Sequence, residues 1–291
     1  MIARVPLRSD SKSTYISNAG VTHAAALTLL LGLLPLASFA QGEDGQSAEE
    51  LAKKLSNPIA SLISVPFQGN YDEKIGPARD GHRFTLNIQP VIPVEINKDW
   101  NLISRTILPV TSQREIFPGA GHQSGIGDVV QSFFFSPKVP TAGGWIWGAG
   151  PVLLLPTGSD DLLSARKWGA GPTAVLLRQD SGWTYGALFN HIWSFAGDGD
   201  RSHVSSTFLQ PFLAYTTKDA WTFGLNTEST YDWNAKQWSA PINASVAKLV
   251  RFGKLPVSLG LNARYWAESP DTGPHDFGGR FSVTFLFPVQ K

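Results

Sequence analysis

The feature that most constrains the fold of this chain is a hydrophobic period of two along segments of about ten residues or more. In residues 82–96 nearly every even position is apolar and most odd positions are polar, from Arg83 and Phe84 to Val94 and Glu95. Side chains alternate across a strand, so such a segment has an apolar and a polar face back to back. The pattern recurs in residues 221–231 and 277–287 and predicts strands, not helices.

On this criterion we expect about twelve strands, at residues 60–71, 82–96, 100–111, 126–137, 144–156, 168–179, 183–196, 204–217, 221–231, 238–250, 256–267 and 277–287. Most reach the ~9–11 residues that a tilted membrane strand needs, whereas strands of soluble proteins more often have ~5–6. The predicted fold is all-β, an antiparallel up-and-down transmembrane β-barrel with a short N-terminal helix. A soluble β-sandwich is the alternative.

The connections between these segments alternate in length. Short ones follow every second strand, at residues 97–99, 140–143, 180–182, 218–220 and 251–255, whereas longer polar ones occur at 112–125, 157–167 and 268–276. In an up-and-down meander this places every tight turn at one end. Outer-membrane barrels have this asymmetry, with short periplasmic turns and longer external loops.

The ten tryptophans fall near strand ends. Those after short turns are Trp100, Trp145, Trp147, Trp183 and Trp221, and those near the opposite ends are Trp168, Trp193, Trp233, Trp238 and Trp266. Two such bands are expected for aromatic girdles at the two membrane interfaces. A soluble sandwich would bury its tryptophans in mid-strand.

Residues 1–40 have the features of a cleaved signal peptide. Arg4, Arg8 and Lys12 form a basic region, residues 24–36 form a short apolar run, and Ser38 and Ala40 are small residues at the cleavage positions. The alternative is an uncleaved anchor helix. Residues 41–59 then form a periplasmic leader, in which Ser47 and Glu50 have the spacing of a capping box and open a helix through Leu55. The barrel is expected over residues 60–291.

Composition excludes several classes of function. The chain has no cysteine, which rules out disulfides, thiolate metal sites and a lipoprotein anchor. Cleavage of the signal peptide removes three of the 24 basic residues and one of the 23 acidic ones, so the mature chain is close to neutral and gives no support to nucleic-acid binding. No stretch beyond residue 40 approaches the ~18 apolar residues of a transmembrane helix.

Several segments resemble a known bacterial family. They are LAKKLSNPIASLISVPFQ (51–68), WNLISRTILPV (100–110), GIGDVVQSFFFSPK (125–138), GAGPVLLLPT (148–157), KWGAGPTAVLL (167–177), WTYGALFNHIWSFAG (183–197) and RYWAESP (264–270). Together they resemble the MetA-pathway of phenol degradation family of transporter-like outer-membrane proteins, over essentially the whole mature chain. The resemblance implies a membrane barrel that moves hydrophobic or aromatic small molecules. The final residues 288–291 depart from barrel habit, because an aromatic residue usually ends the last strand.

The sequence carries no nucleophile elbow, zinc-protease or phosphate-loop motif, and we expect no enzyme activity, cofactor or metal. His191, with a serine such as Ser206 on the next strand, is the one arrangement that could serve a hydrolase. Asp160, Asp161, Asp198 and Asp200 lack the full spacing of a calcium loop and are interpreted as solvated loop carboxylates.

The polar strand face gives the candidate functional residues. If the apolar face meets lipid, the side chains that point into the lumen are Arg83, Gln89, Glu95, Asn226, Glu228, Asn243, Asn262, Arg264, Arg280 and Thr284. A charge on the lipid face near the midplane would cost ~2–4 kcal/mol, which favours this orientation. These residues could line a narrow pore or form a hydrogen-bonded plug, and a twelve-stranded barrel is wide enough for either.

The sequence therefore predicts a passive outer-membrane channel for small, hydrophobic or aromatic molecules. Its expected partners are outer-membrane lipid and lipopolysaccharide, the solute and the outer-membrane assembly machinery. Two alternatives remain open, a structural or surface-interaction barrel without a conducting pore, and an outer-membrane hydrolase.

Overall fold

The computed structural model describes residues 47–287. Its one helix is α1 (Ala48–Leu55), and its strands are β1 (Ile63–Ile75), β2 (Gly81–Ile88), β3 (Val91–Glu95), β4 (Trp100–Arg114), β5 (His122–Ile126), β6 (Val129–Pro137), β7 (Trp145–Leu155), β8 (Lys167–Asp180), β9 (Trp183–Gly197), β10 (Ser205–Thr216), β11 (Trp221–Thr227), β12 (Ser229–Asp232), β13 (Gln237–Phe252), β14 (Leu255–Glu268) and β15 (Asp276–Phe287). The predicted signal peptide and the C-terminal residues 288–291 lie outside the described residues. Within 47–287, no helix is long and apolar enough to cross a membrane.

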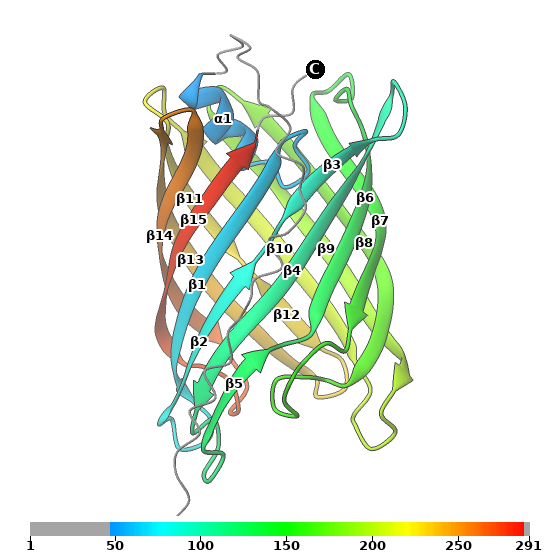
Figure 1. The fold of residues 1–291 in the computed structure, drawn as a ribbon, viewed down its shortest axis with the longest axis vertical. Coiled ribbons are helices and arrows are strands. Elements are labelled where there is room, and N and C mark those ends of the chain that lie inside the picture. Colours follow the sequence, from blue (N-terminus) through cyan, green and yellow to red (C-terminus); the bar gives the residue numbers. More distant parts are fainter. Residues whose placement is uncertain (1–46, 288–291) are drawn as a thin grey trace, which may run out of the picture. The chain divides into compact units, whose positions relative to one another are not determined.

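The strands form one closed antiparallel barrel (Figure 1). β2 and β3 continue one another, as do β5 and β6, and β11 and β12, so that twelve strands complete the circle. Closure comes from β1 and β15, which pair from Ile63 opposite Phe287 to Tyr71 opposite Gly279. The predicted fold class is confirmed. Closure leaves no unpaired sheet edge, which is the condition for a sheet to span lipid.

Two of the three interruptions have local causes. The register of β2 and β3 against β4 is continuous, and the break falls at Pro90, which has no N–H to donate to the ladder. Between β5 and β6 the register against β4 shifts by one residue, which is a bulge at Gly127 and Asp128. The strand made of β5 and β6 begins at His122, four residues before the predicted start at 126.

Short turns join the strands at one end of the barrel, which we call the turn end, and the longer connections lie at the other, the loop end. The turn between β8 and β9 has only Ser181 and Gly182 between the paired residues Asp180 and Trp183. Both have positive φ, 50° and 87°, as a type I′ turn requires. A Cβ at Gly182 would lie 2.8 Å from the carbonyl oxygen of Thr216, so only glycine fits there.

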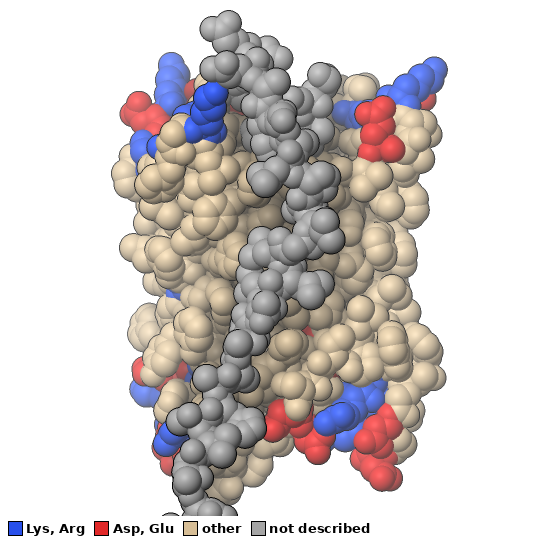
Figure 2. Space-filling view, viewed as in Figure 1, with Lys and Arg blue, Asp and Glu red and all other residues tan. Residues whose placement is uncertain are grey.

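The outer face carries large apolar side chains between the two ends. Their exposed fractions reach 46% at Phe84, 52% at Leu225, 61% at Leu261 and 52% at Phe281. Figure 2 shows the charged side chains gathered at the two ends of the barrel, with an uncharged band between them. Apolar surface this continuous is rare on a soluble monomer and is what a lipid-facing wall requires.

Most predicted girdle tryptophans lie on this outer face. The exposed ones are Trp147, Trp168, Trp183, Trp193, Trp221, Trp233 and Trp238, and Trp100 and Trp145 are half-buried against aromatic neighbours. Trp266 is different. It has the same position in the alternation of β14 as the buried Arg264, so it points into the lumen, and its assignment to the girdle is wrong. The assignment used its place near a strand end and not the face on which it lies.

Candidate ligand cavity and ion network in the lumen

Four charged side chains from strands far apart in sequence meet inside the barrel, near the loop end. Arg264 of β14 lies 3.3 Å from a carboxylate oxygen of Asp72 in β1 and 3.2 Å from one of Glu228, which lies between β11 and β12. Arg280 of β15 lies 2.7 Å from the same Glu228 oxygen. We call these four side chains the ion network. They bridge β1, β14, β15 and the β11–β12 strand.

Neutral side chains satisfy the remaining donors and acceptors of the ion network. Arg264 donates from Nε to Asn243 Oδ1 at 3.0 Å, and Arg280 donates from Nε to Asn70 Oδ1 at 2.6 Å. The indole N–H of Trp266 donates to Asp72 at 3.0 Å. Asn243 in turn donates to Asn226 Oδ1 at 2.9 Å. Such partners are what allow paired charges to stay buried, because desolvation otherwise exceeds their attraction.

Two further arginines point inward and form no ion pair with a carboxylate of the described residues. Arg105 of β4 donates from Nη2 to Gln89 Oε1 at 3.1 Å, and Arg83 of β2 donates from Nε to Gln113 Oε1 at 2.8 Å. Within residues 47–287, neither arginine has an ion pair within 4.0 Å. Among the described residues, the arginines Arg83, Arg105, Arg264 and Arg280 thus point inward together with the carboxylates of Asp72 and Glu228.

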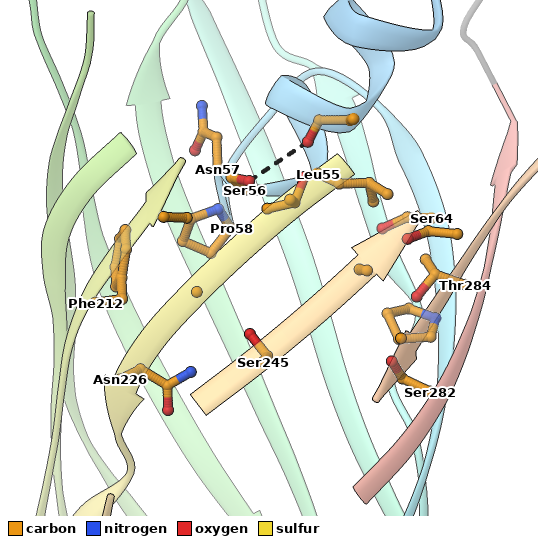
Figure 3. A pocket seen from close by; sticks show the side chains of 18 of the residues that line it. Leu55, Ser56, Asn57, Pro58, Ser64, Phe212, Asn226, Ser245, Ser282 and Thr284 are labelled. Atoms are coloured by element: carbon orange, nitrogen blue, oxygen red, sulfur yellow. Dashed lines mark hydrogen bonds between the residues drawn. The ribbon is translucent and has the colours of Figure 1, made fainter. Parts of the chain in front are cut away.

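Between the ion network and α1 lies a cavity of about 330 Å³. Its wall on β13, β14, β15 and β1 includes many small polar side chains and a glycine, namely Ser64, Ser245, Ser258, Gly260, Ser282 and Thr284. Larger apolar side chains, including Leu55, Leu62, Val91 and Phe212, line the rest. Figure 3 shows Phe212 on one side and Ser64, Ser282 and Thr284 on the other. The cavity exists because the small side chains do not fill the lumen.

The N-terminal segment, residues 47–62, closes the turn end of the barrel (Figure 1). Leu51 and Ala52 of α1 form a buried cluster with Leu249 of β13 and Leu286 of β15. From the opposite wall, Gln179 of β8 donates to the carbonyl oxygen of Lys53 at 2.7 Å. β8 and β15 are the sixth and twelfth strands of the circle, so α1 spans the mouth.

The residues after α1 extend this closure into the lumen. Ile59 is buried in a cluster with Ile103, Phe134, Val175, Leu177 and Leu188, which belong to β4, β6, β8 and β9. A Cβ on Gly148 of β7 would lie only 3.3 Å from Ile59 Cδ1, so the glycine leaves the space that Ile59 occupies. Asn101 of β4 also donates to Ser61 Oγ at 2.9 Å. The N-terminal segment thus contacts both walls.

The structure brings most of the predicted lumen residues together. Glu228, Arg264 and Arg280 form the ion network, Asn226 and Asn243 bond to it, Gln89, Asn262 and Thr284 line the cavity, and Arg83 bonds to Gln113. Glu95 lies elsewhere. It is the last residue of β3, its side chain is 72% exposed, and it pairs with Lys138 at 2.8 Å. The alternation of β3 predicts the face on which Glu95 lies, but at the end of the strand a side chain on that face lies outside the cavity.

The sequence reasoning missed Asp72, Asn70 and Arg105. The first strand was predicted to end at residue 71, whereas β1 continues to Ile75 and its alternation carries Asp72 inward. Arg105 was passed over, although a lone arginine in the middle of an apolar segment is itself a signal. A charged side chain there must face the lumen or meet lipid at a cost of ~2–4 kcal/mol.

The arrangement considered for a hydrolase does not form. Thr207, not Ser206, lies opposite His191 across the β9–β10 pair, and His191 Nδ1 is 2.7 Å from Thr207 Oγ1. Ser206 lies opposite Ile192, so its side chain points to the other face of the wall.

The loop carboxylates stabilise their own loops. Asp160 accepts from the backbone N–H of Leu162 at 2.8 Å, and Asp198 accepts from that of Asp200 at 3.0 Å. Asp161 pairs with Arg166 at 2.6 Å. Within the described residues, no group of three or more histidine or acidic side chains could hold a metal ion.

No family model and no curated protein matches this chain. Among solved structures, the COG4313 outer membrane channel from Pseudomonas putida F1 is similar with a TM-score of 0.62 and 15% identity, over 78% of this chain and 94% of that one. The NanC porin gives a TM-score of 0.48 and 10% identity, over 77% of this chain and 100% of that one. The calcium-bound outer membrane phospholipase dimer of Salmonella typhi gives a TM-score of 0.45 and 10% identity, over 81% of this chain and 97% of that one. Of these three, the first shows that this chain shares its fold with an outer membrane channel.

Proposed function

We propose that this protein is an outer-membrane channel through which small hydrophobic or aromatic molecules pass without energy coupling. The single observation that carries the proposal is the cavity of about 330 Å³ inside a closed barrel whose outer wall is apolar. A lumen filled by side chains would serve only stability, whereas this lumen keeps a space large enough for a small molecule.

The lining of the cavity indicates the kind of solute. Leu62, Val91 and Phe212 supply apolar surface, and Ser245 and Ser282 supply hydroxyls. A compact molecule with an apolar body and a polar group fits this mixture. The resemblance to the MetA-pathway of phenol degradation family points to the same class of solute, and membership of that family is part of the proposal.

The proposed setting follows from the same features. Residues 1–40 act as a cleaved signal peptide, and the assembly machinery inserts the barrel into the outer membrane with its turn end toward the periplasm. The apolar band then contacts lipid, and the loop end meets lipopolysaccharide. α1 lies at the periplasmic mouth in this orientation.

A second candidate is a structural barrel that does not conduct. The observation that favours it is the N-terminal segment, because Leu51 is 1% exposed and Ile59 is 4% exposed against the lumen wall. The two candidates differ in whether this closure opens.

Single-channel recording in planar bilayers separates them. The purified mature protein should give discrete conductance steps, and a variant lacking residues 47–60 should conduct several-fold more because the mouth is cleared. Heat-modifiable migration on gels verifies that the variant keeps its barrel. Absence of steps from both proteins, with both barrels folded, would contradict the channel and favour the structural barrel.

A further inference from the structure

The charged side chains that line the cavity are all cationic. They are Lys54 of α1, Arg105 of β4 and Arg280 of β15, and no aspartate or glutamate among the described residues joins them. Since opposite charges attract more strongly where water is displaced, an anion is favoured in this space over a neutral or cationic molecule.

The two arginines differ in how many of their donors already have a partner. Arg280 is fully engaged, with Nη1 and Nη2 at 2.8 Å and 2.7 Å from the two Glu228 oxygens and Nε bonded to Asn70. Among the described residues, Arg105 has one hydrogen-bonded donor, Nη2, whose partner is the neutral Gln89. The other donors of the Arg105 guanidinium are therefore free to meet a ligand.

Arg105 is also held in place. Gln89 accepts from Arg105 with Oε1 and donates from Nε2 to Gln68 Oε1 at 2.8 Å, which fixes the amide with its oxygen toward the guanidinium. Gln68, Gln89 and Arg105 all line the cavity. A guanidinium positioned in this way loses little freedom when it pairs with a planar carboxylate, which is the anion whose geometry it matches.

The cavity offers the rest of a binding site. Phe212, Leu62 and Val91 provide an apolar surface, and its volume lies at the lower end of the ~300–1,000 Å³ usual for small-molecule sites.

We infer that the cavity binds a small organic monoanion, an apolar carboxylate whose carboxylate group pairs with Arg105 and whose body lies against Phe212 and Leu62. The inference rests on the proposed function in that it names the solute class of the channel. Binding itself needs no conduction, so the two can be tested apart.

The test is equilibrium binding of benzoate to the purified mature protein in detergent, measured by isothermal titration calorimetry. Benzamide, a neutral molecule of almost the same shape, is the ligand control. Benzoate should bind at least tenfold more tightly than benzamide, since a charge-assisted pair is lost with the amide. Equal affinity for the two would overturn the inference.

Variants identify the residue responsible. Arg105→Gln should weaken benzoate binding at least tenfold and abolish the preference over benzamide. Arg105→Lys keeps the charge but not the planar fork, and should give an intermediate affinity. The matched control is Arg178→Gln on β8, which does not line the cavity and pairs with Asp180 at 3.8 Å. Unchanged benzoate affinity in Arg105→Gln, or in Arg105→Lys if the first variant does not fold, would overturn the assignment.

These results are independent of the conductance experiment. Benzoate binding that depends on Arg105 in a barrel that never conducts would keep the site and remove the channel. Conductance steps without preference for benzoate would keep the channel and remove the site.

Discussion

Side chains close the lumen in two places, and the two closures differ in the kind of interaction that forms them. Near the loop end, the ion network consists of Asp72, Glu228, Arg264 and Arg280, all from the barrel wall itself. At the turn end, the N-terminal segment closes the mouth with apolar contacts around Leu51 and Ile59. The first closure belongs to the wall, and the second is an appendage that precedes the first strand.

This difference determines what each closure can do. Removing one charge from the ion network leaves the remaining buried charges with fewer partners of opposite sign, so separating the network has a large cost in free energy. The N-terminal segment can leave the mouth with every strand-to-strand hydrogen bond of the barrel intact. The cost is the exposure of its apolar side chains and the loss of its hydrogen bonds with Gln179 and Asn101. We therefore expect the ion network to stabilise the barrel, and the N-terminal segment to be the closure that can leave the lumen without disrupting the strands.

Neutralising Glu228 gives the largest expected effect. Glu228→Gln leaves Arg264 and Arg280 with Asp72 as their only carboxylate, and should lower the free energy of unfolding by about 3 kcal/mol. The measurement is guanidinium unfolding of the barrel in lipid vesicles, followed by tryptophan fluorescence.

The matched control is Glu95→Gln, which removes the same charge from an exposed pair with Lys138. Exposed pairs contribute little, so this variant should unfold almost as the parent does. If Glu228→Gln were no less stable than Glu95→Gln, the ion network would not have the structural role assigned to it.

Truncating Leu51 is expected to have a smaller and more local effect. Leu51 is 1% exposed in the cluster that docks α1, and Leu51→Ala should weaken that docking by about 2–3 kcal/mol. Because the barrel strands do not depend on α1, hydrogen exchange of the α1 amides should accelerate while exchange in the strands stays unchanged.

Leu162→Ala is the control, since Leu162 lies in a loop at the other end and is 40% exposed. This variant should change the hydrogen-exchange rate of neither the α1 amides nor the strand amides. Faster exchange throughout the strands in Leu51→Ala would mean that the N-terminal segment is part of the barrel's folding unit, and the division between the two closures would fail.

How far the sequence predicts this structure also differs between wall and interior. Alternation predicted the barrel because each face of a membrane strand meets a single kind of environment, lipid outside and polar lumen inside. For that reason it places Glu228, Arg264 and Arg280 on the polar strand face, and in the structure these three side chains meet in the ion network. The capping box of Ser47 and Glu50 is a local signal of the same kind, and both of its hydrogen bonds are present.

Contacts across the lumen carry no such signal. The pairing of Asp72 with Arg264 depends on closure between β1 and β15, which places residues 192 positions apart beside each other. The cavity depends on which inward positions are small, for example Ser245 and Ser282, and a small polar residue alone suggests nothing. The burial of Ile59 against Phe134 depends on where a turn directs the chain. These features depend on which strands meet across the closed barrel, and a hydrophobic period of two within one strand carries no information about that.

The smallest effect is expected at the start of the N-terminal segment. Ser47 Oγ accepts from the backbone N–H of Glu50 at 3.1 Å, and Glu50 Oε2 accepts from that of Ser47 at 3.2 Å. Ser47→Ala removes the acceptor and should destabilise α1 by about 1 kcal/mol, or about fivefold in the exchange rate of its first-turn amides. Ser47→Asp keeps an acceptor and should exchange as the parent does. Equal exchange rates in both variants would show that the packing of Leu51 alone holds α1 in the mouth, without a contribution from the capping box.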